Sequence, residues 1–221
     1  MRITNVSWTG WETMNDKHFS TKEKILIAAI DLFAEKGYGN VSVREIAKKV
    51  GIKASSLYKH YESKEALLES IFAFFRQKML EADFPNQDMR QYLQSVTPGE
   101  YLNQSFLLFK QVMWTSEAMK ISKIINMEQQ RNQSVRQFFM EELIIKPNHM
   151  LQHVLDLMVE NGSIDDMDTR VLAEEYNSFI LYLYFEQNFL KEGPSLDEIE
   201  RKMKQHNDFY AHVVLKKKEG Q

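Results

Sequence analysis

Apolar side chains recur along most of this chain at intervals of three and four residues, the spacing that gathers them on one face of an α-helix. In the N-terminal third the pattern predicts helices over residues 21–36, 43–50, 54–61 and from 64 to about 83. Beyond a polar linker at 86–96 it predicts five more, over residues 98–114, 117–129, 132–161, 169–190 and 196–216. No stretch alternates convincingly with period two, so we expect an all-α fold.

Polar residues mark where several of these helices begin. Ser or Thr stands three residues before Glu at four predicted starts, as in a capping box, where each side chain accepts a bond from the other residue's backbone N–H. The pairs are Ser20–Glu23, Ser42–Glu45, Thr97–Glu100 and Ser195–Glu198. Pro147 falls inside the segment 132–161, where a proline removes a helical hydrogen bond and crowds the preceding turn. We therefore expect a kink or a break there.

The second and third predicted helices are short, and the turn Val50-Gly51-Ile52-Lys53 joins them. Gly51 can adopt a positive φ that reverses the chain, and two short helices meeting at such a turn form a helix-turn-helix. The third helix is predicted to bury Ala54, Leu57, Tyr58 and Tyr61, and to present Ser55, Ser56, Lys59 and His60 outward. Small residues at its start allow it to enter the major groove, where base edges are read. Lys53, Lys59 and Lys64 are expected to contact phosphates.

The charge distribution agrees with nucleic-acid binding at this end of the chain. Residues 17–64 contain ten Lys or Arg and five Asp or Glu, a net charge of +5. The whole chain carries −3, so the other residues together carry −8. A solvated helix face is the ordinary explanation of scattered lysines, but here the basic residues surround the predicted turn. We therefore assign them to DNA binding.

Residues 25–68, ILIAAIDLFAEKGYGNVSVREIAKKVGIKASSLYKHYESKEALL, resemble the tetracycline-repressor (TetR) family of bacterial regulators. The residues that match the family pattern are Ala29, Leu32, Phe33, Gly37, Ser42, Val43, Ile46, Ala47, Gly51, Ile52, Leu57, Tyr58, His60, Tyr61, Ser63, Lys64, Glu65 and Leu67. Ser42 stands where threonine is commoner, Lys53 where serine is, and Tyr61 where phenylalanine is. The matching stretch is about a fifth of the chain.

The resemblance implies a homodimer with an Ω shape and about nine helices per chain. An N-terminal helix-turn-helix domain (19–66) would bind a palindromic operator, and a larger helical domain (67–221) would bind a ligand and dimerise. The DNA contacts it implies include Ser42, Arg44, Tyr58, His60 and Lys64. Such a protein is a transcriptional regulator, and we expect a repressor that a ligand releases. Control by a partner protein or a metal is the alternative.

Aromatic and methionine side chains crowd the predicted helices of the larger domain. More than one face of these helices is apolar, which suits either helices buried on several sides or helices that line a cavity. The predicted pocket residues are Phe75, Met79, Phe106, Trp114, Phe139, Tyr176 and Phe179. An unknown small apolar or aromatic molecule is the expected ligand. Ordinary core packing is the alternative for each of these residues.

The last predicted helix carries apolar or aromatic side chains at spacings of 4, 3, 4 and 3, as in a coiled-coil seam. These residues are Ile199, Met203, His206, Tyr210 and Val213. With the helix at 169–190, this seam is expected to form a four-helix interface with a second copy. Packing within the chain is the alternative.

Other classes of protein find little support in the sequence. There is no cysteine, which excludes disulfides and thiolate chemistry and fits a reducing cytoplasm. No segment has the ~18 apolar residues that a membrane helix needs. His149 and His153 could share a helix face, but without an obvious third ligand we expect no metal. No phosphate-binding loop or nucleophile elbow is present, so we expect no cofactor and no enzyme.

Residues 1–18 show no periodic pattern. They are expected to be a tail, or upstream sequence that precedes a true start at Met14.

Overall fold

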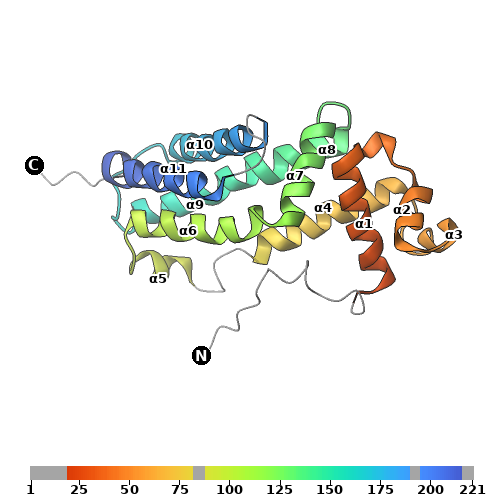
Figure 1. Cartoon of the computed structure of the whole chain (residues 1–221). Coiled ribbons are helices and arrows are strands. Elements are labelled where there is room, and N and C mark those ends of the chain that lie inside the picture. Colours follow the sequence, from red (N-terminus) through yellow and green to blue (C-terminus); the bar gives the residue numbers. More distant parts are fainter. Residues whose placement is uncertain (1–18, 82–87, 190–194, 216–221) are drawn as a thin grey trace, which may run out of the picture. The chain divides into compact units, whose positions relative to one another are not determined.

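The computed structural model describes residues 19–81, 88–189 and 195–215, and in these ranges the regular structure is entirely helical (Figure 1). The α-helices are α1 (Thr21–Lys36), α2 (Val43–Val50), α3 (Ala54–Leu57), α4 (Lys64–Glu81), α5 (Met89–Leu93), α6 (Pro98–Met113), α7 (Ser116–Glu128), α8 (Gln133–Met140), α9 (Lys146–Glu160), α10 (Thr169–Phe189) and α11 (Leu196–Phe209). A 3₁₀ turn, η2 (Tyr38–Asn40), and two π-helical segments, η3 (Glu141–Ile145) and η4 (Tyr210–Val214), complete the list. The all-α prediction is confirmed. The tail predicted at 1–18 lies outside the described residues.

The described residues form two compact units. The first holds residues up to Gln77 together with Thr115–Glu128, and the second holds Lys78–Trp114 and the chain from Gln129 onward. Helix α4 contributes to both, because its last four residues belong to the second unit. The first unit is thus larger than the segment 19–66 expected for DNA binding, since it also contains α7 and most of α4.

Helix α1 is the centre of the first unit, where it contacts both α2 and α7. One of its faces is fully buried, including Ile25 and Phe33. Its Asp31 carboxylate binds Lys49 of α2 at 3.1 Å and Lys120 of α7 at 2.9 Å. Burial opposes ionisation of Asp31, but the hydrogen bonds from Lys120 and Lys49 outweigh it and hold the pKa of the carboxyl below its usual value. This carboxylate therefore ties three helices together.

The helix starts follow the predicted capping boxes in part. Ser20 with Glu23 and Thr97 with Glu100 form both bonds of the box, as predicted. Ser42 accepts a bond from the Glu45 N–H at 3.2 Å, but the Glu45 carboxylate pairs with Lys36 instead of returning to the cap. The box predicted at Ser195 is wrong. Ser195 makes no side-chain cap, and its N–H donates to the Gln187 side chain at 3.0 Å.

Two short segments differ from the prediction. Helix α3 ends at Leu57 instead of residue 61. The Tyr58 N–H still bonds the carbonyl four residues back, but those of Lys59 and His60 bond to carbonyls three residues back. The stretch 86–96, predicted as a linker, contains α5. Asp88 caps this helix by accepting a bond from Arg90 N–H, and Leu93 anchors it in the core of the second unit.

The chain stays helical across Pro147, so the predicted break is not observed. Helices α8 and α9 are joined without interruption by η3, in which the Lys146 N–H bonds to the Glu141 carbonyl five residues back. Pro147 lacks an N–H and cannot continue the ladder, and a π-helical segment just before it absorbs the mismatch. The proline therefore changes the helical register instead of ending the helix.

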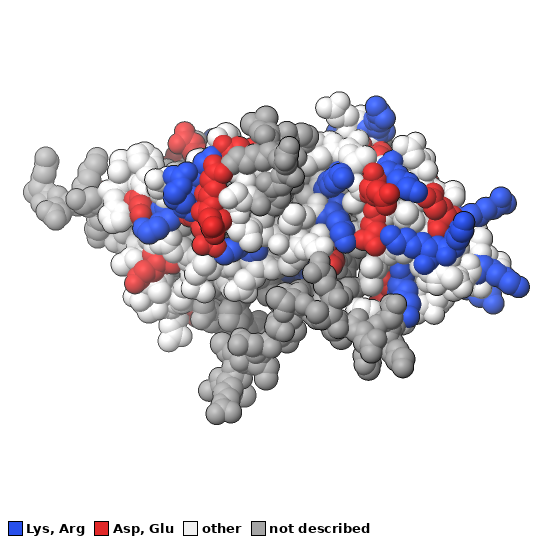
Figure 2. All heavy atoms as spheres, in the orientation of Figure 1, with Lys and Arg blue, Asp and Glu red and all other residues white. Residues whose placement is uncertain are grey.

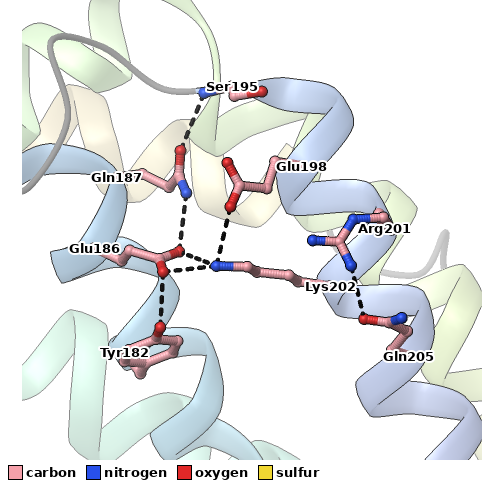
Figure 3. A network of polar contacts seen from close by, with 8 residues as sticks. All are labelled: Tyr182, Glu186, Gln187, Ser195, Glu198, Arg201, Lys202 and Gln205. Atoms are coloured by element: carbon pink, nitrogen blue, oxygen red, sulfur yellow. Dashed lines mark hydrogen bonds and ion pairs between the residues drawn. The ribbon is translucent and has the colours of Figure 1, made fainter.

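The second unit has its own core, to which α6, α9, α10 and α11 all contribute. Helices α10 and α11 lie side by side and share a polar cluster (Figure 3). Lys202 of α11 donates to both oxygens of Glu186 of α10 at 2.6 Å, and to Glu198 at 3.1 Å. Glu186 also accepts from Tyr182 and Gln187. These bonds lower the pKa of Glu186 to about 2, the Lys202 bond most of all.

The Glu186 cluster predicts a pH dependence of stability. A carboxyl whose pKa is lowered on folding stabilises the fold above its ordinary value of 4.5, and loses that effect as pH falls towards about 2. Glu186→Gln should therefore lower the free energy of unfolding near neutral pH, and the gap to the native chain should close through that pH range. Urea unfolding at a series of pH values measures it. Glu175→Gln, an exposed position of α10, controls for the loss of one carboxylate. A gap that stays constant with pH contradicts the prediction.

A second prediction concerns Gly37, which ends α1 with φ 83° and ψ 147°. A Cβ there would lie 3.2 Å from Met127 Cε and 3.3 Å from Glu128 Oε1 of α7. Gly37→Ala should lower the free energy of unfolding by about 1–3 kcal/mol, because the backbone conformation is almost restricted to glycine. Urea titration measures the loss. Gly39→Ala, which meets no atom within 4 Å, is the matched control and should change stability by less than about 0.5 kcal/mol.

Candidate DNA-binding surface and ligand cavity

The turn between α2 and α3 has the geometry of a helix-turn-helix. Gly51 adopts the left-handed conformation with φ 77° and ψ 27°, as expected, and its N–H bonds back to Ala47 and Lys48. The Ile52 N–H then bonds to the Ala47 carbonyl at 3.0 Å. Helix α3 begins two residues later, and Leu57 anchors it in the core with no exposed surface. The glycine thus reverses the chain and α3 is held by one buried side chain.

The side chains predicted to contact DNA lie at the surface or close to it. Those that are exposed are Ser42, Arg44, Lys53, Ser55, Tyr58, Lys59 and His60, and those that are half-buried are Ser56 and Lys64. Tyr58 is 51% exposed, so the prediction that α3 buries it is wrong. Its assignment to the DNA surface stays a prediction. Figure 2 shows basic side chains projecting from the part of the first unit that carries α2 and α3.

Lys64, at the start of α4, is held by an aromatic ring. Its ammonium lies 4.1 Å from the centroid of the Tyr38 ring, and burial lowers its pKa. Tyr38 is fixed in turn, because its hydroxyl donates to Glu65 at 3.1 Å and its N–H donates to Glu128 of α7 at 3.0 Å. Sequence reasoning missed both Tyr38 and Glu128. Glu128 lies ninety residues away along the chain, so no local pattern could have found it.

The second unit contains a cavity of about 210 Å³ between α6, η3, α9 and α10, with Met79 of α4 at one side. Three predicted pocket residues line it: Met79, Phe106 and Tyr176. The other four are placed elsewhere among the described residues. Phe75 is buried in the first unit, and Phe139 packs against Phe185. Trp114 meets Phe106 and Phe109 edge-on, with centroids 6.2 and 5.7 Å apart, and Phe179 stacks on His206 at 4.2 Å.

The cavity wall is apolar and aromatic, with a few polar groups that the sequence did not single out. The residues added by the structure include Tyr101, Ser105, Phe109, Glu142, Pro147, Asn177 and Tyr184. Glu142 is 9% exposed and binds Lys146 at 2.7 Å. Its position depends on η3, a feature that periodicity alone does not predict.

The stripe predicted as a dimer seam packs mostly within its own chain. Ile199, Met203 and Tyr210 belong to the core of the second unit, and each is at most 4% exposed. His206 is half-buried beside the Tyr176 carbonyl, and burial lowers its pKa. Only Val213 is open, at 65% exposure. At Ile199, Met203 and Tyr210 the structure therefore favours the intrachain alternative.

Other exposed apolar side chains are found on the last three helical elements of the second unit. Besides Val213 of η4, they are Val171 and Tyr182 of α10 and Leu196 and Phe209 of α11.

Neither a metal site nor a membrane span is found in the part of the chain that the structure describes. No three His, Asp or Glu residues there are grouped as metal ligands, and His149 and His153 are exposed. None of the described helices has the length and apolar character to cross a membrane.

The sequence pattern described as "Bacterial regulatory proteins, tetR family" matches residues 25–71, which contain α2, α3 and most of α1. Among curated proteins, the chain is similar to the biofilm operon icaADBC HTH-type negative transcriptional regulator IcaR of Staphylococcus epidermidis, with 45% identity over 58 residues. This similarity takes in 24% of the present chain and 31% of IcaR. The chain thus matches less than a third of the length of that relative.

Similarity in fold extends much further along the chain. A putative TetR-family transcriptional regulator from Mesorhizobium loti superimposes with a TM-score of 0.67 at 21% identity, over 87% of this chain and 96% of that one. A putative transcriptional regulator from Saccharomonospora viridis, in complex with choline, gives a TM-score of 0.61 at 21% identity, over 89% and 98%. Fold and surface thus define a helix-turn-helix protein with a second, larger helical unit. Residues 25–71 thus match the tetR family of bacterial regulatory proteins, and the fold of the chain resembles that of solved TetR-family regulators.

Proposed function

We propose that this protein is a transcriptional repressor that binds a palindromic operator as a homodimer in the cytoplasm and is released by a small apolar or aromatic molecule. The observation that carries the proposal is the helix-turn-helix, in which α3 is anchored by Leu57 while Ser55, Lys59 and His60 are exposed. The similar IcaR is a negative regulator, which supports repression over activation.

The α3 surface suits direct reading of DNA. Small side chains at its start let the helix approach base edges closely, and Lys53 and Lys59 stand on either side of them to meet phosphates. One such unit contacts one half-site, so two copies related by a two-fold axis would read a palindrome with half-sites about one helical turn apart.

Release requires that a ligand bind more tightly to a conformation that does not bind DNA. The cavity of the second unit is the proposed ligand site, and the S. viridis neighbour solved with choline supports a small organic ligand in this fold. Helix α4 is the proposed lever, because Lys64 stands at its start and Met79 lines the cavity near its end. Control by a partner protein or a metal remains the alternative, and operator-release screening separates it.

The primary test is operator binding and its dependence on salt. The native chain should bind a palindromic site far more tightly than random DNA, and its affinity should fall steeply with salt as counterions are released. Lys64→Ala should weaken binding to all sequences about equally and lower the salt slope by about 1, because one phosphate contact is lost. Fluorescence anisotropy at several salt concentrations measures both.

Lys123→Ala, at an exposed position of α7 in the same unit, is the control and should leave the slope unchanged. An unchanged slope for Lys64→Ala contradicts the assignment of that contact. Equal affinity for all DNA sequences contradicts the operator itself.

Homodimer formation is tested at exposed positions, since Glu at the buried Met203 would disturb the fold itself. We propose that the exposed apolar side chains Phe209 and Val213 meet the second copy. The double substitution Phe209→Glu and Val213→Glu places two charges there, and burying unpaired charges costs several kcal/mol. The variant should be monomeric by light scattering and should lose operator binding. Leu107→Glu, also on an exposed apolar residue but on α6, should remain dimeric. A dimeric double variant places the interface elsewhere.

Ligand release is tested with a single fluorophore. Trp114 meets two phenylalanines of the cavity wall, so with Trp8 and Trp11 replaced by Phe its emission should report occupancy. Apolar and aromatic compounds that change this emission should also lower operator affinity, by about 5- to 150-fold for a typical coupling. Compounds that perturb Trp114 without ever changing DNA affinity would show that the cavity is not connected to DNA binding.

A further inference from the structure

Among the residues that the structure describes, the wall of the cavity in the second unit has a single charged side chain. Of the seventeen described residues that line it, Glu142 alone is charged at neutral pH, and no lysine, arginine or histidine is among them. The Glu142 side chain is 8% exposed. A carboxylate in an otherwise apolar wall is costly unless a positive charge or hydrogen-bond donors reach it.

The π-helical segment η3 accounts for this placement. Glu142 and Leu143 of η3 line the cavity together with Pro147. Pro147 has no N–H, so it adds no backbone donor to this part of the wall, where Glu142 contributes its carboxylate.

Three polar side chains of the wall donate to groups other than Glu142. The Ser105 hydroxyl donates to the Tyr101 carbonyl at 2.8 Å, and the Tyr176 hydroxyl donates to Asn207 Oδ1 at 2.8 Å. The Asn177 amide nitrogen donates to Asn148 Oδ1 at 2.9 Å, which leaves its oxygen as an acceptor. Among the described residues, Glu142 therefore gives the wall a negative charge, and a ligand of complementary chemistry carries positive charge.

Aromatic rings supply the rest of the complementarity. The wall contains five of them: Tyr101, Phe106, Phe109, Tyr176 and Tyr184. The face of an aromatic ring attracts a cation while its carbon surface still packs against apolar groups. Such a wall favours a cation with an apolar body over a small hydrated ion.

We propose that the cavity binds an apolar organic cation and that Glu142 is its counter-ion. The inference rests on the proposed function, since it names the class of ligand for the same cavity. In the structure, Lys146 neutralises Glu142 from outside, because it is not part of the cavity wall and its side chain is 53% exposed. It bonds one carboxylate oxygen, Oε1, so a bound cation competes with Lys146 for the carboxylate or shares it.

The test compares two compounds of nearly the same shape. Benzyltrimethylammonium carries a positive charge, and neopentylbenzene is its neutral counterpart with carbon in place of nitrogen. Calorimetric titration of the full chain should show about tenfold or more tighter binding of the cation. Glu142→Gln keeps the shape of the side chain and should abolish this preference. Glu141→Gln, the exposed neighbour outside the cavity, should preserve it.

A second variant tests the competition without removing the carboxylate. Lys146→Met should tighten cation binding by about two- to fivefold, the range expected for an exposed ion pair, and should leave binding of the neutral compound unchanged. A purely structural Glu142–Lys146 pair predicts no gain.

Equal binding of the two compounds, no binding of either, or a preference that survives Glu142→Gln overturns the proposal. Operator binding is measured separately in the same preparations. It distinguishes failure of the proposed ligand class from failure of the proposed function. A chain that binds DNA selectively but shows no cation preference retains the function and loses only the ligand class. A chain that prefers the cation but binds all DNA sequences equally keeps the ligand class and loses the proposed function.

Discussion

The position of Tyr38 is the constraint on which the DNA-binding unit depends most. This residue follows α1, and it joins three segments at once. Its ring packs edge-on against Phe33, and the Lys64 ammonium lies over the same ring. Its hydroxyl donates to Glu65, and its N–H donates to Glu128. The start of α4 and the end of α7 are thus fixed to the segment between α1 and α2. Because Lys64 would otherwise sample many rotamers, this contact positions a charge that the proposed DNA surface needs.

Local sequence patterns specify most of the helices but not the details where distant groups compete. The two complete capping boxes were predictable because both partners lie within one turn. At Ser42 the box is incomplete because Glu45 pairs with Lys36 of another helix, and Ser195 makes no side-chain cap because tertiary contacts to α10 replace it. Helix propensity is summed over residues that are adjacent in sequence, so it does not include partners on other helices. Pro147 is a second example. The helix accommodates its missing N–H through the π-helical segment η3, which the hydrophobic pattern does not predict.

The two candidate sites also differ in how far local sequence predicts them. The helix-turn-helix is a local motif, so its glycine, its anchor and its exposed polar face could all be predicted from spacing. The cavity is built from four separate segments, and spacing alone does not say which aromatic faces inward. Phe106 and Tyr176 lie in the cavity wall, whereas Phe179 stacks on His206, and Glu142 belongs to the π-helical segment. The stripe at Ile199 and Met203 has the same period whether it packs inside the chain or against another copy.

The membership of α7 in the first unit has a consequence for constructing chimeric regulators. A DNA-binding module cut after α4, which ends at Glu81, would lack α7, which begins only at Ser116. Such a fragment would lack α7, which packs on α1 and contributes the buried Ile121, Ile124 and Ile125, and it would leave Asp31 without Lys120. Swapping specificities between regulators of this kind would therefore require transplanting two discontinuous pieces, or redesigning the uncovered side of α1. The first unit is compact in space but is formed by two separate stretches of the sequence.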